Sequence, residues 1–286
     1  MNLETKIDII NQMKFKNLDS AFKQLLHNVY IVGLDVNSRG SRQKELLFSN
    51  FVIEDPTALM IHSPHRKFSV DYATAEWLWY LSANPRVNNI GKLAKIWVQI
   101  QDDVGEAESN YGCYLKPQWD WVIDELLRDR DTRRATIVIN QPHHKGKNKL
   151  DYPCTHYLHF FVRENKLHLG VNMRSNDIIF GLCNDVFTFC MFQQLMLNEL
   201  NARGAEVSLG SYHHHAGSLH LYERHFSMAE KIVVNSREIK DPDKFILDPD
   251  LTWKNAIDAR IPLTPREASK DEIKEFVKLT MEKIYV

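Results

Sequence analysis

Residues 151–185 read DYPCTHYLHFFVRENKLHLGVNMRSNDIIFGLCND, and the rest of the chain is organised around this stretch. It predicts a pair of strands over 157–162 and 166–172, with Cys154 before the first strand and Arg174 after the second. Because paired strands lie about 5 Å apart, we expect the hairpin to bring Arg174 back beside Cys154. A nearby guanidinium lowers the pKa of a thiol and favours the nucleophilic thiolate. The stretch therefore predicts a reactive cysteine.

The composition indicates a globular protein with one domain over residues 1–286. Chains of this length exceed the usual size of one domain, yet α/β folds of this size often form one. The apolar content of 44% supports a substantial core. The net charge is −1 with both signs interspersed, so no basic tail predicts direct binding of nucleic acid. Any anionic group would have to be bound by local clusters of Arg and His.

The cysteine spacing and the N-terminus predict a cytoplasmic protein. The four cysteines, at positions 113, 154, 183 and 190, show no CxxC spacing, which suggests neither a zinc site nor a disulfide scaffold. The N-terminal MNLETKIDII lacks the features of a signal peptide, and no apolar run approaches the length of a membrane span. The run His213–His215 has no partners at ligand spacing, so we expect no bound metal.

Patterns elsewhere predict further helices and strands. Apolar residues at helical spacing predict a helix within 14–29, with Asp19 and Ser20 as candidate caps. The polar segment 35–48 contains Gly40 and predicts a loop that leads into a strand over 45–53. Segment 142–150 predicts a polar loop before the cysteine. The remaining predicted elements are helices over 70–82, 119–130, 183–203 and 266–284 and a strand over 136–140.

The order of motifs resembles that of the thymidylate synthase family, including its pyrimidine-hydroxymethylating relatives. Pro153-Cys154, the strand pair and RSxDxxxGL carry the resemblance, which covers roughly residues 30 to 230. Further motifs follow in the same order: Glu76 in EWLWYL, Trp97, Tyr111-Gly112, Arg133-Arg134 and His220-Leu221-Tyr222. The resemblance implies an α+β fold with a mixed β-sheet and flanking helices. It also implies that one face of the sheet forms the interface of a two-fold homodimer.

The resemblance implies that arginines hold the phosphate of a pyrimidine nucleotide monophosphate. Arg39 and Arg42 lie where the family has a phosphate-gripping loop, and a solvated loop is the alternative. Arg133 and Arg134 would cross the dimer interface to the partner subunit's phosphate site, and a solvated surface pair is the alternative. Arginine suits phosphate because its planar fork makes bidentate bonds.

The resemblance also implies covalent chemistry at Cys154. Its thiolate would add to C6 of the pyrimidine and make C5 nucleophilic, while Arg174 and Ser175 contact the phosphate. Glu76 would organise active-site water and proton transfer. A glutamate on the helix surface is the alternative, because a lone buried carboxylate is costly unless it is paired or used. Tyr111 would lie near the C5 proton, and a core tyrosine is the alternative.

Two further pairs of residues would bind the sugar and the one-carbon donor. His220 and Tyr222 stand two residues apart on a predicted strand, so they share one face. The resemblance implies that they hold the 3′-hydroxyl group of the sugar. Trp97 and Asp177 would contact the donor, 5,10-methylenetetrahydrofolate. The C-terminus of family members folds over the ligand, which the ending Tyr285-Val286 matches only loosely.

Asp185 is expected to read the base. Thymidylate synthase has an asparagine eleven residues after the arginine of RSxD, and counting from Arg174 places Asp185 there. An ionised carboxylate accepts both N3–H and N4–H of a cytosine adduct, whereas an asparagine suits uracil. Two alternatives stay open. Asp185 could be an acidic N-cap of the following helix, or a one-residue slip could place Asn184 at the base and restore a uracil substrate.

Departures from the methylating enzymes lie mainly on the folate side. Val98-Gln99-Ile100 replace two acids and a second tryptophan, which favours a wetter site, and Thr155 stands where thymidylate synthase usually has histidine. Within the family the sequence therefore resembles the deoxycytidylate 5-hydroxymethyltransferases that phages encode. We expect one-carbon transfer to C5 of dCMP with addition of water, in the cytoplasm of the host cell. The alternatives are a dCMP or dUMP C5-methyltransferase, a CMP hydroxymethylase, and an inactive nucleotide-binding or interaction protein.

Overall fold

The computed structural model describes residues 13–145, 150–235, 242–258 and 267–286. Its described strands form one eight-stranded sheet. They are β1 (Met13–Phe15), β2 (Leu34–Ser38), β3 (Ser41–Ile53), β4 (Thr136–Val138), β5 (Thr155–Arg163), β6 (Lys166–Met173), β7 (Asn176–Asp177) and β8 (Ser208–Tyr222). The order is β1-β3-β8-β6-β5-β4, with β2 paired to β3 and β7 paired to β8. The sheet is mixed, because β8 pairs antiparallel with β3 and parallel with β6.

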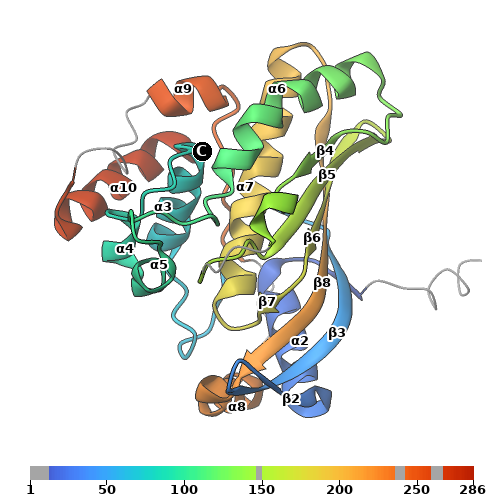
Figure 1. Ribbon diagram of the computed structural model, residues 1–286. Helices are drawn as coiled ribbons and strands as arrows, with labels where there is room; N and C mark the ends of the chain where they lie inside the picture. The colour runs from blue at the N-terminus through green and yellow to red at the C-terminus, as the bar shows by residue number, and fades with distance from the viewer. Residues whose placement is uncertain (1–12, 146–149, 236–241, 259–266) are drawn as a thin grey trace, which may run out of the picture.

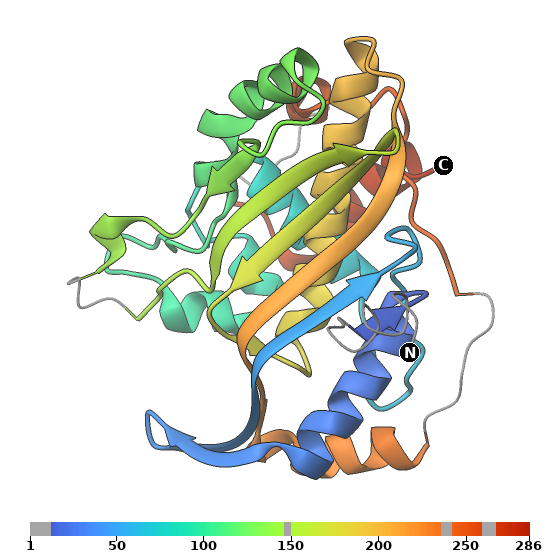
Figure 2. The ribbon, with the colours of Figure 1, turned by 90° about the vertical axis from the view of Figure 1, so that its right-hand side faces the viewer.

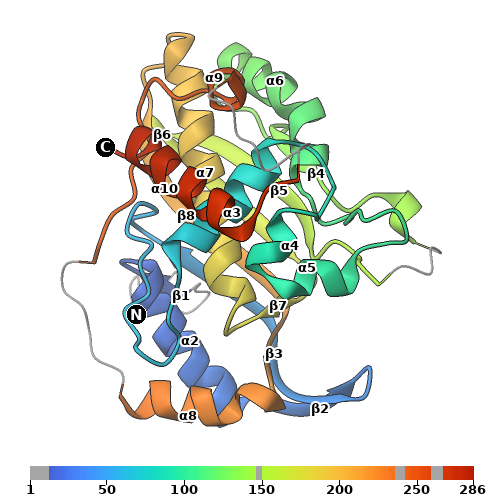
Figure 3. The same ribbon diagram turned by 90° about the vertical axis from the view of Figure 1, so that its left-hand side faces the viewer.

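The described helices gather on one face of this sheet, as Figures 1 and 3 show. They are α2 (Leu18–Val32), α3 (Val70–Leu81), α4 (Ile90–Leu93), α5 (Lys95–Ile100), α6 (Gly112–Arg128), α7 (Gly181–Ala202), α8 (Phe226–Val234), α9 (Trp253–Asp258) and α10 (Lys270–Ile284), with 3₁₀ turns η1 (Pro142–His144) and η2 (Glu223–His225). Figure 2 shows β8, β6 and β5 from the other side, with no helix in front of them. The predicted α+β class with a mixed sheet and flanking helices is confirmed. Among these helices none has the length and apolar character needed to cross a membrane.

Helix α7 forms the centre of the core. Its side chains Phe187, Phe189 and Phe192 are fully buried. The ring of Phe192 packs edge-on against Trp77 of α3, with 6.2 Å between ring centroids. Fully burying a side chain of this kind contributes roughly 1.5–3 kcal/mol. This packing fixes the middle of α7 against α3, and the first turns of the same helix carry Asp185.

The hairpin predicted within residues 151–185 is confirmed. β5 and β6 pair antiparallel, and Arg163 lies opposite Lys166 next to the connecting turn. The two turn residues, Glu164 and Asn165, both have positive φ, at 51° and 55°. Positive φ at both positions is typical of the two-residue turn whose twist matches that of the strands. The hairpin therefore sets which residues before β5 and after β6 lie side by side.

Two local predictions near the N-terminus are wrong. The segment 35–48 is not a loop, because β2 and β3 pair as an antiparallel hairpin from Leu34 to Glu45. Its tip is Arg39-Gly40, where both residues have positive φ. The cap of α2 is Asn17, whose Oδ1 accepts a hydrogen bond from the backbone N of Ser20 at 2.8 Å. The strand pairing, and a cap that lies two residues before the first predicted one, both depend on contacts that local composition does not specify.

The C-terminal part of the chain packs behind α3. The helix predicted over 266–284 is present as α10, and residues 259–266 lie outside the described ranges. The hydroxyl group of Tyr285 lies 2.9 Å from Oγ1 of Thr74, and the backbone N of Val286 donates to the carbonyl of Ile246 at 3.0 Å. Thr74 faces away from Glu76 on α3, because residues two apart on a helix point in nearly opposite directions. The C-terminus therefore does not fold over the site in this structure.

Candidate active site

A cavity of about 770 Å³ lies where α3, α5, the start of α7 and the ends of β7 and β8 meet. Its size is within the usual range of a small-molecule site. It brings together nine of the predicted site residues: Glu76, Trp97, Tyr111, Cys154, Ser175, Asp177, Asp185, His220 and Tyr222. These residues are separated by up to 146 positions in the sequence, from Glu76 to Tyr222. The fold therefore assembles one cavity from most of the predicted motifs.

Arg174 lies beside Cys154, as the hairpin predicts. Its Nη2 is 3.5 Å from Sγ of Cys154, and its backbone N donates to the carbonyl of Cys154 at 2.8 Å. The guanidinium also donates to the carbonyls of Tyr152, at 2.7 Å, and Pro153, at 3.2 Å. The carbon of the guanidinium lies 5.0 Å from the centroid of the Tyr152 ring. These contacts hold the positive charge against the thiol.

The prediction that Arg174 lowers the pKa of Cys154 is confirmed, but burial has a larger effect in the opposite direction. Burial raises the pKa of the Cys154 thiol to about 11, and Arg174 offsets only part of this effect. The carboxyl groups of Asp185 and Asp151 contribute to this raised pKa, whereas Arg39 opposes it. The sequence shows the arginine but not the burial, and burial dominates. The thiol is therefore protonated at neutral pH before any ligand binds.

Glu76 is buried in the cavity, so the alternative of a solvated helix surface is wrong. Its side chain is 7% exposed and its Oε1 accepts a hydrogen bond from the hydroxyl group of Tyr72 at 3.1 Å. Burial and then the charge of Asp185 raise the pKa of Glu76 to about 8, against the lowering effect of the bond from Tyr72. Glu76 is thus mainly protonated near neutral pH and can act as a proton donor.

Tyr72 is a cavity residue that the sequence interpretation missed. Its hydroxyl group accepts a hydrogen bond from Nε1 of Trp97 at 3.0 Å while it donates to Glu76. The chain of bonds therefore joins the tryptophan on α5 to the acid on α3. The spacing could have indicated Tyr72, because residues four apart share one face of a helix. Arg66 and Arg224 also line the cavity and were not predicted.

Asp185 lies in the cavity on the second turn of α7. Its Oδ2 accepts a hydrogen bond from Nδ2 of Asn176 at 2.7 Å. Burial raises the pKa of Asp185 to about 7, the bond from Asn176 lowers it, and the charge of Asp177 raises it. The alternative of an N-cap is wrong, because α7 begins four residues earlier at Gly181. Asn184 also lines the cavity, so the alternative of a one-residue slip stays open.

Asp177 lies just before α7 and holds the turn that leads into the helix. Its carboxylate accepts hydrogen bonds from the backbone N of Ile179 at 3.2 Å and of Phe180 at 3.1 Å. A carboxylate is favourable at this end of a helix, where backbone N–H groups lack partners. The expected contact of Asp177 with the pterin ring stays a prediction, since Asp177 lines the cavity as well.

His220 and Tyr222 lie on one face of β8, as the alternation of a strand predicts. Their ring centroids are 4.8 Å apart and the rings are nearly perpendicular. Burial lowers the pKa of His220, so the ring is neutral at physiological pH. Tyr111 packs its ring against Tyr80, at 5.2 Å between centroids, and against Phe189 at 5.8 Å. Tyr111 is thus a core tyrosine that also lines the cavity.

The four remaining predicted arginines do not line the cavity of this chain. Arg39 lies at the tip of the β2–β3 hairpin, close enough for its charge to lower the pKa of Cys154. Arg42 pairs with Asp35 at 3.1 Å and with Glu223 at 3.0 Å. Of the two hairpin arginines, Arg39 is therefore the better placed to meet a phosphate. The other two arginines, Arg133 and Arg134, are exposed on the segment before β4.

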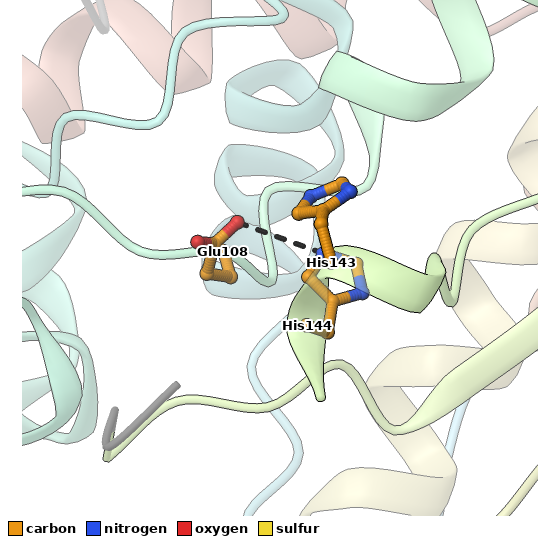
Figure 4. Close-up of side chains that lie close together, drawn as sticks. All are labelled: Glu108, His143 and His144. Carbon is orange, nitrogen blue, oxygen red and sulfur yellow. Dashed lines mark ion pairs between the residues drawn. The ribbon is translucent and has the colours of Figure 1, made fainter. Parts of the chain in front are cut away.

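One cluster in the described part of the chain has the residue types of a metal site, namely Glu108, His143 and His144 (Figure 4). His144 is buried, and its Nδ1 accepts a hydrogen bond from the backbone N of Gln141 at 2.9 Å. This bond places the ring proton on Nε2, which lies 2.8 Å from the hydroxyl group of Tyr114 and 3.6 Å from Glu108. Both nitrogens of His144 are thus engaged in hydrogen bonds. The polar loop predicted over 142–150 begins with this ordered turn, and residues 146–149 lie outside the described ranges.

The comparisons with known proteins agree with the assembled cavity. A sequence model of the family described as Thymidylate synthase matches residues 20–259. The deoxycytidylate 5-hydroxymethyltransferase of Enterobacteria phage T4 is 30% identical over 207 residues, which cover 68% of this chain and 82% of that protein. The thymidylate synthase of Bacillus atrophaeus is 28% identical over 182 residues, which cover 59% of this chain and 77% of that protein. The solved structure of thermostable thymidylate synthase A from Bacillus subtilis aligns with a TM-score of 0.68 at 21% identity, covering 82% of this chain and 90% of that one.

Proposed function

We propose that this chain, which belongs to the thymidylate synthase family, transfers a one-carbon unit from 5,10-methylenetetrahydrofolate to C5 of dCMP and completes the reaction with water. The product would be 5-hydroxymethyl-dCMP. The observation that carries the proposal is the carboxylate of Asp185 in the same cavity as the thiol of Cys154. The names of the phage relatives support the same substrate and reaction.

The nucleotide reaction begins at Cys154. Its Sγ would form a bond to C6 of cytosine, the electron pair of the C5=C6 bond would move into the C4–C5 bond, and the pair of the C4=N3 bond would move to N3. Cys154 loses a proton in this step and N3 gains one. Asp185 is suited to pass that proton, because its pKa of about 7 lies near the working pH. The ionised Asp185 then accepts hydrogen bonds from N3–H and N4–H of the adduct.

The second half of the reaction needs a proton donor and a water molecule. C5 would form a bond to the one-carbon unit of the folate. Loss of the C5 proton, with cleavage of the bond between that carbon and the folate nitrogen, would then release tetrahydrofolate and leave an exocyclic methylene group on the ring. Water adds to that methylene group, the electron pair returns to the ring, and Cys154 leaves C6 as the C5=C6 bond forms again. Glu76 is suited to deliver and accept protons here, since its pKa of about 8 allows both forms.

The folate would lie on the side of the cavity formed by α5. Trp97 lines this side together with the apolar residues Leu93 and Ile100. An apolar wall with one aromatic ring fits a flat pterin and its aromatic linker. The cavity is also lined by Tyr72 and Glu76, which are joined by a hydrogen bond. These two polar groups are placed to hold a water molecule beside the bound ring, which favours hydroxymethylation over hydride transfer.

The phosphate would be held by Arg174 and Ser175 of one subunit with help from Arg39. Arg133 and Arg134 of a second copy would complete the site, which requires a two-fold homodimer. The uncovered face of the sheet is the surface on which we propose that the two copies pair (Figure 2). Mixed polar and apolar side chains with partial exposure occupy this face along β5, β6 and β8.

The test is an assay with dCMP, dUMP and CMP, each incubated with the folate donor, followed by mass measurement of the products. We expect a gain of one CH₂O unit on dCMP, and the absence of any gain on dCMP would reject the proposal. The second candidate is C5 methylation of dUMP or dCMP. Asn184 also lines the cavity, and an asparagine that contacts the base would suit uracil. Methylation oxidises the folate to dihydrofolate, so a rise in its absorbance would select that candidate. Turnover of CMP in place of dCMP would identify a ribonucleotide hydroxymethylase.

A further inference from the structure

Asn176 is the side chain that contacts Asp185 most closely. It lies in β7, is 3% exposed and lines the cavity. Its Nδ2 donates to Oδ2 of Asp185 at 2.7 Å, and no other side chain of the described residues donates a hydrogen bond to that carboxylate. The backbone of Asn176 is held in turn by pairing with Leu219 of β8. The backbone that carries the amide group is therefore held by the sheet, independently of α7.

The orientation of this amide group follows from its partner. Nδ2 must face the carboxylate of Asp185, because the reverse orientation would set two acceptors against each other. Oδ1 of Asn176 accepts no hydrogen bond from the described chain. The single bond to Asp185 therefore determines how the amide lies. The same bond uses one lone pair on Oδ2 of Asp185. The other lone pairs of the carboxylate stay available to a ligand.

Gly181 packs against both partners. A Cβ at this position would lie 3.2 Å from Nδ2 of Asn176 and 3.5 Å from Oδ2 of Asp185. The same Cβ would lie 3.4 Å from Cβ of Asp177. The absence of a side chain at Gly181 thus leaves room for the amide and the carboxylate to approach each other. Three positions on two elements are arranged around one hydrogen bond.

Burial and the charge of Asp177 oppose the ionisation of Asp185, and other titratable groups face it across the cavity, which also holds the cationic side chains Arg66, Lys67 and Arg224. Glu76 faces it from α3, Asp177 from β7 and Cys154 from the segment before β5. Its charge also affects the buried tyrosines of the cavity, namely Tyr72, Tyr80, Tyr111 and Tyr212. The bond from Asn176 is the contact that favours the charged form, since it donates to the carboxylate.

We infer that Asn176 is a positioning residue that keeps the Asp185 carboxylate anionic and turned toward the nucleobase, so that the Asn176–Asp185 pair selects an aminopyrimidine. This inference rests on the proposed reading of the base by Asp185. A carboxyl group that gains a proton loses one acceptor, so it can no longer accept both N3–H and N4–H. Without Asn176 the cavity would therefore lose selectivity for cytosine as well as activity near neutral pH.

The first test is a titration that does not depend on turnover. The carboxyl group of Asp185 is followed by carbon NMR in selectively labelled protein and is assigned by its loss in Asp185→Asn. We expect Asn176→Ala to raise the pKa of Asp185 by about one unit, the value of one hydrogen bond to a charged group. Asn176→Asp is expected to raise it further, because a second carboxyl group then faces the first. An unchanged titration in Asn176→Ala would overturn the inference.

The second test is the pH profile of kcat/KM for dCMP and dUMP. In Asn176→Ala the acid limb is expected to move up by about one pH unit, and the preference for dCMP at neutral pH to fall by about tenfold. Gly181→Ala is the variant to use if Asn176→Ala does not fold, because it keeps both partners and separates them. It is expected to move the limb in the same direction. A limb and a preference that stay in place in these variants would contradict the inference.

Asn198→Ala is the matched control. Asn198 is also a buried asparagine, and its Nδ2 donates to the carbonyls of Asp248 at 2.8 Å and Leu251 at 3.1 Å, away from the cavity. The control is expected to lower the melting temperature without moving either the titration or the pH limb. If the wild-type protein turns over dUMP and not dCMP, the proposed function fails. The titration of Asp185 still decides whether Asn176 sustains its charge.

Discussion

Replacing Asp185 with asparagine is expected to change the nucleobase that the enzyme accepts. In the variant, the amide oxygen at position 185 must face Nδ2 of Asn176, which lies 2.7 Å from Oδ2 in the native protein. The new NH₂ group then occupies the position of the other carboxylate oxygen. A donor at this position suits O4 of uracil and opposes the amino group of cytosine. The rest of the cavity is unchanged by the substitution.

The magnitude follows from the hydrogen bonds that are lost. The cytosine adduct keeps one acceptor and meets a donor in place of the second, so one group on each side is left without a partner. Each buried unsatisfied group costs about 1–3 kcal/mol, or about 2–6 kcal/mol for the two. This corresponds to a loss in kcat/KM for dCMP of about 30-fold to about 10⁴-fold. We expect turnover of dUMP to rise in the same variant.

The assay is steady-state turnover of dCMP and dUMP with 5,10-methylenetetrahydrofolate, with products identified by mass. Asn184→Ala is the control, because Asn184 would read the base if the register were shifted by one residue. We expect this control to keep the preference for dCMP. The reasoning is refuted if Asp185→Asn keeps the native preference, or if Asn184→Ala is the variant that loses it.

Three further predictions concern the other polar groups of the cavity and the second subunit. Tyr72→Phe removes the bond that lowers the pKa of Glu76, so the limb of the pH profile that reports this group should move above about pH 8; a limb that stays would show that another group titrates there. Glu76→Gln should melt at a higher temperature than the native protein, increasingly so as pH rises toward 8. The folded-state pKa of Glu76 is raised, so stability is complete at low pH and is lost as the carboxyl group ionises. Thermal unfolding at a series of pH values measures this, and a constant difference would contradict it. Mixing inactive Arg133→Ala with inactive Cys154→Ser should restore up to about a quarter of the native activity per site, because random pairing gives mixed dimers with one site built from native residues. No recovery after subunit exchange would exclude a shared site.

The sequence predicted the parts of the site that depend on local pattern. The hairpin around residues 151–185 follows from two strands and a short turn, and it correctly places Arg174 beside Cys154. The shared face of His220 and Tyr222 follows from strand alternation. These predictions succeeded because strand pairing and side-chain alternation are short-range properties of the chain.

Burial and distant partners explain what the sequence could not predict. The pKa of Cys154 depends on how much protein surrounds the thiol, and this outweighs the visible arginine. Arg42 is occupied by Glu223, which lies 181 positions away in the chain. Asn176 occupies the variable position of the RSxD motif, so the motif offered no reason to select it. The fold places its amide group against Asp185. Such contacts arise from the packing of elements that are far apart in sequence.

The covalent step offers the most direct measurement. 5-Fluoro-dCMP is incubated with the protein and the folate donor, and the peptide that contains Cys154 is weighed after digestion. Fluorine at C5 cannot leave as a proton does, so the bond between Sγ and C6 is expected to persist. The account predicts a peptide heavier by the nucleotide and the folate together, and a much lower yield with 5-fluoro-dUMP. An unmodified Cys154 peptide, or equal trapping of both nucleotides, would contradict it.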